Sequence, residues 1–182
     1  MRLFVALDLP DFILNALDAL VKQLKPTAPI HWSNISSLHI TTKFIGEWPD
    51  ARLPEMKSAL ASVPHPGALT IHIEDLGWFP GPQSPRVFWA GIRASGSLEN
   101  LAHETDKATA ALGVPAETRK FHPHLTLARI KQSTGLAALQ QAIAKLDSLA
   151  FGEFTAQSQF LYQSKLGPSG SVYTKLAEFP LS

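Results

Sequence analysis

The spacing of hydrophobic residues predicts helices and strands that alternate along the chain. Apolar residues three and four positions apart predict four helices, at residues 10–24, 50–63, 97–112 and 134–147. Apolar and β-branched runs predict strands at residues 2–8, 38–45, 68–79, 86–93, 124–130, 153–165 and 171–178. Clusters of proline and glycine separate several of these segments, as is typical of turns.

The order of these elements repeats within the chain. The first half contains a helix, a strand, a helix and two strands, and the second half contains the same series. Such an order favours antiparallel hairpins over a parallel doubly wound sheet. We therefore predict one α+β domain over residues 1–182, a bilobal duplicated fold of two pseudo-symmetric lobes. Two antiparallel sheets would line a central groove, with the helices on the outer faces.

One strand in each half carries a His-x-Thr triplet. His39 and Thr41 form the first, and His124 and Thr126 form the second, 85 residues (124 − 39) further on. Side chains at positions i and i+2 of a strand share a face, so each histidine should lie beside its threonine. Two imidazoles can serve as general base and general acid, and two hydroxyls can donate to charged oxygens. Together these groups suit phosphodiester hydrolysis without a metal.

Composition narrows the setting of this chemistry. Of the 182 residues, 45% are hydrophobic and 17% are charged, as in a folded globular protein. The chain has no cysteine, which excludes disulfides, thiolate catalysis and cysteine-ligated metals. The net charge of +1 implies that an anionic ligand must be held by local groups. No run approaches the ~20 apolar residues of a membrane helix, and the first residues do not form a signal peptide. We expect a cytoplasmic monomer.

Four further residues near the triplets have more than one reading. Phe44 and Arg129 each follow a triplet histidine by five residues, and simple alternation places both on the opposite face of the strand. Lys43 shares the His39 face by the same rule, where it would add charge to the groove or lie at a solvated strand edge. His122 and His124 have a spacing seen in metal sites. Because carboxylates are missing around both triplets, we expect no metal and no cofactor.

The ordered set of motifs resembles the two-histidine phosphoesterases, in particular the RNA 2′,3′-cyclic phosphodiesterases, historically called 2′-5′ RNA ligases. The matching segments are residues 2–7, Trp32, residues 39–46, residues 85–91, residues 122–129, residues 161–164, residues 167–170 and Tyr173. One departure is Thr42, where the family usually has leucine. By alternation Thr42 points away from His39, so the difference concerns packing more than chemistry.

The resemblance implies a function and roles for the residues. The substrate would be an RNA end with a 2′,3′-cyclic phosphate, opened to a 2′-phosphomonoester, with reversible 2′-5′ ligation in some members. Arg129 would bind the phosphate, which requires a bulge or a strand end, and Phe44 would either stack on a base or pack in the core. We assign His124 as base and His39 as acid. The alternatives are a non-catalytic nucleotide-binding module and a cyclic phosphodiesterase for a small nucleotide such as ADP-ribose 1″,2″-cyclic phosphate.

Overall fold

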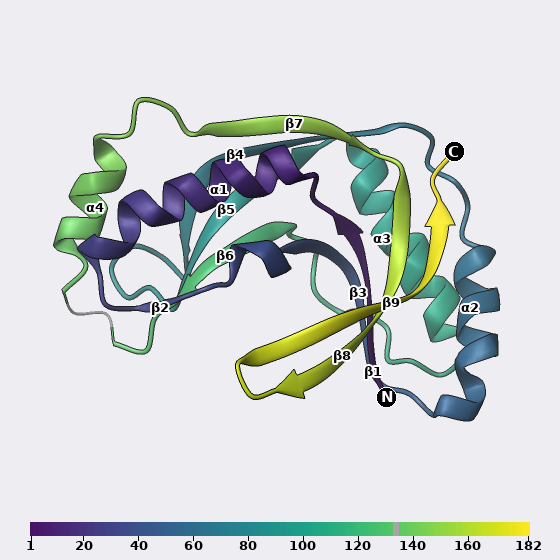
Figure 1. The fold of residues 1–182 in the computed structure, drawn as a ribbon. Coiled ribbons are helices and arrows are strands. Elements are labelled where there is room, and N and C mark those ends of the chain that lie inside the picture. The colour runs from purple at the N-terminus through teal and green to yellow at the C-terminus, as the bar shows by residue number, and fades with distance from the viewer. Residues whose placement is uncertain (133–134) are drawn as a thin grey trace.

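The computed structural model describes residues 1–132 and 135–182, which form four α-helices and nine β-strands (Figure 1). The helices are α1 (Asp11–Leu24), α2 (Leu53–Ala61), α3 (Gly96–Ala110) and α4 (Ala137–Ala144). The strands are β1 (Arg2–Asp8), β2 (His31–Trp32), β3 (His39–Glu47), β4 (Leu69–Phe79), β5 (Val87–Ala94), β6 (His124–Arg129), β7 (Ala150–Ala156), β8 (Ser158–Gly167) and β9 (Gly170–Pro180). The predicted start of the fourth helix lies outside the described residues.

The strands form two antiparallel sheets, which confirms the predicted α+β class. Sheet A has the order β3-β1-β8-β9, and sheet B has the order β2-β6-β5-β4-β7. The two triplet strands lie in different sheets, β3 at the edge of sheet A and β6 inside sheet B. Each sheet combines strands from both halves of the chain, so the two sheets do not correspond to two consecutive halves. The division into two pseudo-symmetric lobes stays a prediction.

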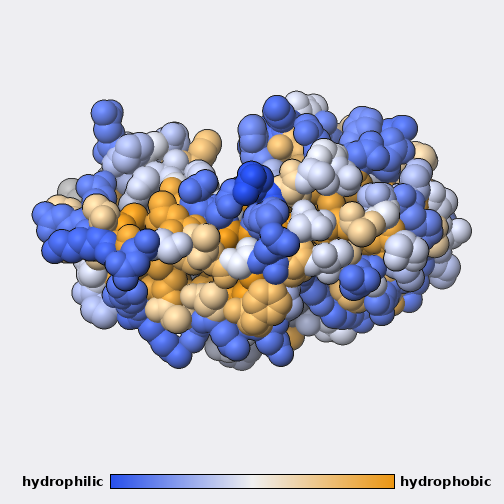
Figure 2. All heavy atoms as spheres, turned by 90° about the horizontal axis from the view of Figure 1, so that it is seen from above, coloured by the Kyte–Doolittle hydropathy of each residue, from blue (hydrophilic) through white to orange (hydrophobic). Residues whose placement is uncertain are grey.

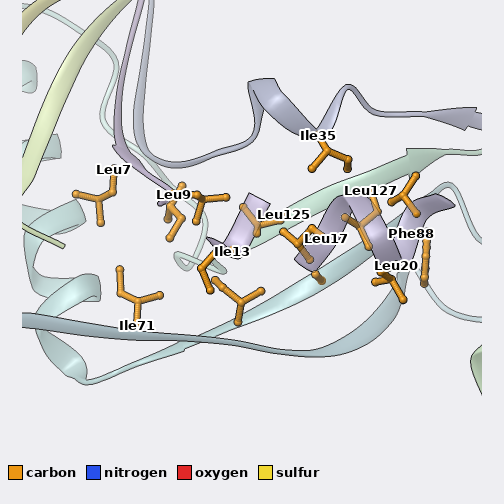
Figure 3. Packing of buried hydrophobic residues seen from close by; sticks show 14 of the residues in the cluster. Leu7, Leu9, Ile13, Leu17, Leu20, Ile35, Ile71, Phe88, Leu125 and Leu127 are labelled. Atoms are coloured by element: carbon orange, nitrogen blue, oxygen red, sulfur yellow. The ribbon is translucent and has the colours of Figure 1, made fainter. Parts of the chain in front are cut away.

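The larger core lies between sheet B and helix α1. Buried residues spaced along one face of α1 include Ile13, Leu17 and Leu20, as its apolar spacing predicts. Figure 3 shows them directed toward Leu125 and Leu127 of β6. Full burial of an aliphatic side chain of this size contributes about 1.5–3 kcal/mol. This packing fixes β6, and with it the second triplet, against α1.

A second core supports the first triplet strand. Leu3 and Val5 of β1 pack with Ile45 of β3 and with Met56 and Leu60 of α2. Helix α3 also packs on β3. Sheet A is therefore covered on one face by α2 and α3.

Figure 2 views the molecule from above, onto the side with α1 and β7, where hydrophobic residues are exposed among hydrophilic ones.

The predicted strand at residues 153–165 is wrong in one respect, because it is two strands in different sheets. β7 pairs with β4 in sheet B, whereas β8 pairs with β1 in sheet A. The chain passes between the sheets at Gln157, whose carbonyl accepts a hydrogen bond from the Leu181 amide at 2.9 Å. Hydrophobic residues of strand type occur on both sides of Gln157, so the sequence carries no sign of the crossing.

Candidate active site

The two triplet histidines have the same local hydrogen bond. Nδ1 of His39 lies 2.9 Å from the Ser37 carbonyl oxygen, and Nδ1 of His124 lies 2.8 Å from the His122 carbonyl oxygen. A carbonyl can only accept, so in both rings Nδ1 carries a proton and donates it. Each ring therefore keeps Nε2 for a ligand. The same orientation, imposed by the residue two positions earlier, occurs in both strands.

A β-bulge follows each triplet at the same position. In sheet A, Thr41 pairs with Ala6 and Lys43 pairs with Val5, which leaves Thr42 as the extra residue. In sheet B, Thr126 pairs with Trp89 and Ala128 pairs with Phe88, which leaves Leu127 as the extra residue. An extra residue reverses the alternation of side chains beyond it. Both strands therefore change phase three residues after the histidine.

The bulges decide the positions of Phe44 and Arg129. The Phe44 side chain is 71% exposed, and its ring lies 6.3 Å from that of Phe4, which stacks on His39. Arg129 is exposed and pairs with Val87, which shares a strand face with Trp89, the partner of Thr126. Both residues thus lie on the histidine side of their strands. The placement by simple alternation is wrong, as is the reading of Phe44 as a core residue.

The bulge also changes the face on which Lys43 lies, and it places this side chain on the side away from His39. Its side chain is 5% exposed, and its ammonium donates to Asp106 Oδ1 at 2.5 Å and to the Pro115 carbonyl at 2.8 Å. The prediction that Lys43 shares the His39 face is therefore wrong. Asp106 also accepts from the Glu117 amide at 3.0 Å. The ion pair thus ties β3 to α3 and to the loop that precedes the second triplet.

Thr42 faces away from His39, as predicted. It is buried, and its hydroxyl donates to Gln159 Oε1 at 2.8 Å and lies 3.2 Å from the Val5 carbonyl oxygen. The Gln159 side chain also lies within hydrogen-bond distance of the Thr105 hydroxyl, at 3.3 Å from Nε2. The buried hydroxyl of Thr42 is therefore satisfied, and through Gln159 it links the bulge to β8 and α3.

Aromatic rings surround His39, whereas no aromatic ring of residues 1–132 and 135–182 stacks on His124. Phe4 stacks on His39 with a centroid distance of 4.7 Å, and Tyr173 meets the imidazole edge-on at 5.2 Å. Burial lowers the pKa of His39, and the Ser37 carbonyl and the Asp8 carboxylate oppose this shift only in part. Asp8 itself accepts hydrogen bonds from the Tyr162 hydroxyl and from Lys175. His124 is exposed. The two histidines therefore differ in environment although their local hydrogen bonds match.

The sequence reasoning missed Phe4 and Tyr173 as neighbours of His39. The signal for Phe4 was present, because it alternates with the core residues Leu3 and Val5 on a strand next to the triplet strand. Tyr173 could not be found in this way, since its position depends on the pairing of β9 with β8. The rings contribute an apolar wall on one side of the His39 imidazole.

The remaining predicted groups keep free hydrogen-bonding capacity. The hydroxyls of Thr41 and Thr126 are half-buried and have no hydrogen-bond partner among the residues that the structure describes. β3 and β6 contact each other where the two sheets meet (Figure 1).

Within residues 1–132 and 135–182, no three histidine, aspartate or glutamate side chains are grouped as a metal site would require. In the same residues no helix is long and apolar enough to cross a membrane.

Comparison with known proteins identifies similar sequences and structures. The model of the LigT-like phosphoesterase family matches residues 7–89 and 92–173. A protein of Archaeoglobus fulgidus named RNA 2′,3′-cyclic phosphodiesterase is 34% identical over 98% of this chain and 99% of its own length. One of the same name from Methanocaldococcus jannaschii is 33% identical, over 98% and 100%.

Solved structures show the same fold. TT0787 of Thermus thermophilus is similar with a TM-score of 0.79 and 28% identity, over 100% of this chain and 98% of that one. E. coli LigT complexed with 3′-AMP has a TM-score of 0.80 and 25% identity, over 100% and 98%. These likenesses extend over the whole chain rather than over the triplets alone.

Proposed function

Since the chain belongs to the LigT-like phosphoesterases, we propose that it is an RNA 2′,3′-cyclic phosphodiesterase. It hydrolyses the cyclic phosphate at an RNA end to a 2′-phosphomonoester, and His39 and His124 together supply the general base and the general acid. The observation that carries this proposal is the shared hydrogen bond of the two rings, which leaves Nε2 of each available for proton transfer.

The reaction needs one base and one acid. The base takes a proton from water, whose oxygen forms a bond to phosphorus as the bond from phosphorus to the 3′ oxygen breaks. The acid gives its proton to the departing 3′ oxygen, so that the product carries a 2′-phosphate and a 3′-hydroxyl. With a 5′-hydroxyl in place of water as the nucleophile, 2′-5′ ligation would use the same groups in the same roles, and the roles would exchange when a 2′-5′ linkage is cleaved back to the cyclic phosphate.

Burial favours His39 as the base. Its lowered pKa keeps the imidazole neutral at a pH where an ordinary histidine begins to take a proton. Exposed His124 then takes the role of the acid. This assignment is the reverse of the one made from the sequence, where the symmetry of the two triplets does not distinguish the roles, and the burial of His39 supports it.

The other predicted residues contact the phosphate and the nucleobase of the substrate. Thr41 and Thr126 donate their free hydroxyls to the non-bridging oxygens as charge builds there, and Arg129 adds a planar guanidinium. The exposed ring of Phe44, on the histidine side of β3, stacks on the terminal nucleobase. A module that only binds nucleotides would not require two histidines held identically, so the geometry favours the enzyme over that alternative.

Arg129 gives a direct test of the bulge in β6. Arg129→Ala is expected to lower kcat/KM by about tenfold or more, because a hydrogen bond to a charged group contributes about 1.5–3 kcal/mol. Arg129→Lys should recover only part of the loss, since it keeps the charge but not the two-pronged geometry. Steady-state kinetics with a cyclic-phosphate dinucleotide measure both. Unchanged kinetics in Arg129→Ala would place the side chain away from the phosphate.

The product and the metal dependence test the proposed function itself. A dinucleotide ending in a 2′,3′-cyclic phosphate should yield only the 2′-phosphomonoester, which phosphorus NMR distinguishes from the 3′ isomer. Activity should survive exhaustive chelation with EDTA, because the described residues contain no group of three histidine, aspartate or glutamate side chains that could hold a metal ion. Loss of activity that zinc or manganese restores would contradict the mechanism.

Turnover of ADP-ribose 1″,2″-cyclic phosphate alone would favour the small-nucleotide alternative. Cytoplasmic location and a monomeric state stay predictions.

A further inference from the structure

We propose that Asp8, Tyr162 and Lys175 form a positioning group for His39, in which the ion pair of Asp8 and Lys175 sets how readily the imidazole takes up a proton. The three residues come from three neighbouring strands, and none of them belongs to a triplet or to its bulge. The inference rests on the proposed function, because that function requires His39 to gain and lose a proton near neutral pH.

The strand pairing of sheet A brings Asp8 beside His39. Asp8 is the last residue of β1, and its partner on β3 is His39. Phe4 lies four residues before Asp8 on the same strand, so the two side chains share one strand face. Phe4 also stacks on His39, at a centroid distance of 4.7 Å. The Asp8 carboxylate therefore lies on the side of sheet A that carries the imidazole.

Tyr162 and Lys175 hold the two oxygens of the Asp8 carboxylate. β8 and β9 follow β1 in sheet A (Figure 1), and Tyr162 of β8 pairs with Lys175 of β9. The Tyr162 hydroxyl donates to Oδ1, and the Lys175 ammonium donates to Oδ2 at 2.5 Å. Tyr162 also packs with Phe4 and Ala6, so the donor hydroxyl is carried by a buried ring. Donors from two strands thus fix the position of the carboxylate.

The charge of Asp8 acts on His39, and Lys175 limits this effect. Burial lowers the pKa of His39, and the Ser37 carbonyl and the Asp8 carboxylate raise it in part. The Lys175 ammonium neutralises much of the negative charge that the carboxylate presents to the imidazole. Burial and the bond to Asp8 raise the pKa of the Tyr162 hydroxyl, so this group keeps its proton and remains a donor. The two charges of the pair therefore act on His39 in opposite directions.

The other ionisable groups near His39 lie on its own strand and on the strands next to it. Lys43 of β3 points away and forms its ion pair with Asp106. Tyr173 of β9 presents its ring to the imidazole edge-on, and His124 lies on β6, which contacts β3. A change of charge at Asp8 or Lys175 therefore alters the field at His39 without removing either ring that packs on it.

The experiment is a pH titration of His39 by proton–carbon NMR, with His39→Gln used to assign the imidazole signal. Asp8→Asn should lower the midpoint of the titration by about 0.5–1 pH unit, the scale of one partly screened charge a few ångströms away. Lys175→Met should raise the midpoint by a similar amount, because it leaves the carboxylate uncompensated. The double variant should have a midpoint between those of the two single variants. No shift, or shifts in the same direction, would overturn the proposal.

A matched pair on α3 provides the control. Glu104 and Lys107 form an ion pair at 3.0 Å, on the helix that covers the other face of sheet A. Glu104→Gln and Lys107→Met should each leave the His39 midpoint unchanged, and shifts equal to those of the Asp8 and Lys175 variants would overturn the proposal. Because the Lys175 side chain is 48% exposed, Lys175→Met tests the charge effect even if Asp8→Asn does not fold.

Tyr162→Phe separates the charges from the packing. This variant keeps the ring that stacks on Phe4, and it keeps both charges of the ion pair, but it removes the donor to Asp8. The His39 midpoint should move less than in Asp8→Asn. A shift as large as that of Asp8→Asn would assign the effect to the hydroxyl and overturn the role of the ion pair.

Kinetics separate this proposal from the proposed function. With a cyclic-phosphate dinucleotide, the limb of the pH–rate profile that belongs to His39 should move down in Asp8→Asn and up in Lys175→Met, as the NMR midpoints do. Opposite NMR shifts without any hydrolysis would support the positioning group and contradict the proposed function. Hydrolysis with midpoints and profiles unchanged in both variants would support the proposed function and overturn the positioning group.

Discussion

His39→Ala and His124→Ala are each expected to reduce kcat by about 10²–10⁴-fold, because each removes one of the two proton transfers of the reaction. The double variant should lose little more activity than the less active of the two single variants, since the effects of groups that act together are not additive. His103→Ala, at an exposed position on α3, serves as the control and should keep full activity. Circular dichroism of all variants separates loss of catalysis from loss of the fold.

The pH dependence of the same variants assigns the two roles. The wild-type rate should form a bell, because the base must be neutral while the acid is protonated. Because the pKa of His39 is lowered, the acidic limb should lie below the ordinary histidine value of about 6.5 if His39 is the base. His39→Ala should then lose the acidic limb of any residual activity, and His124→Ala the basic limb.

A substrate with sulfur at the 3′ bridging position provides an independent check of this assignment. A thiolate leaves without a proton, so the variant that lacks the acid should regain activity with this substrate, whereas the variant that lacks the base should not. We expect recovery in His124→Ala. Recovery in His39→Ala would reverse the roles, and a bell that persists in both alanine variants would exclude these histidines as the acid and base.

The sequence predicted the parts of the fold that depend on local pattern. The spacing of Ile13, Leu17 and Leu20 identified both the helix and its buried face, and the triplets identified two strands in different sheets. The crossing at Gln157 escaped prediction, because the hydrophobic residues on its two sides belong to strands of different sheets, and no turn signal separates them. A pattern along one chain records which positions are buried but not which strand lies beside them.

The same limit explains the errors around the site. Thr42 and Leu127 give no sign of being extra residues, since a bulge is a property of the pairing between two strands. Simple alternation past these extra residues places Lys43 on the histidine face, where it does not lie. It also places Phe44 and Arg129 on the opposite face, although both lie on the histidine side. The family resemblance supplied the correct side for Arg129 because the resemblance reflects the paired structure. Alternation along a strand therefore predicts the face of each side chain only as far as the first β-bulge.

The Lys43 ion pair should be among the most important polar contacts for stability. Asp106→Ala leaves a buried ammonium with only the Pro115 carbonyl, and removing one partner of a buried pair costs about 3–5 kcal/mol. The control lies on the same helix, where Glu104 pairs with exposed Lys107 at 3.0 Å. Glu104→Ala should cost only about 0–1 kcal/mol, because water screens an exposed pair.

Urea denaturation followed by fluorescence measures the free energy of unfolding of both variants. Replacing both charges, as Lys43→Met with Asp106→Leu, should recover most of the loss, since an apolar pair of similar volume avoids burying charge. It should not recover full activity, because the bond from Asp106 to the Glu117 amide holds the loop before His124. Equal destabilisation by Asp106→Ala and Glu104→Ala would show that the burial of Lys43 does not set the strength of this contact.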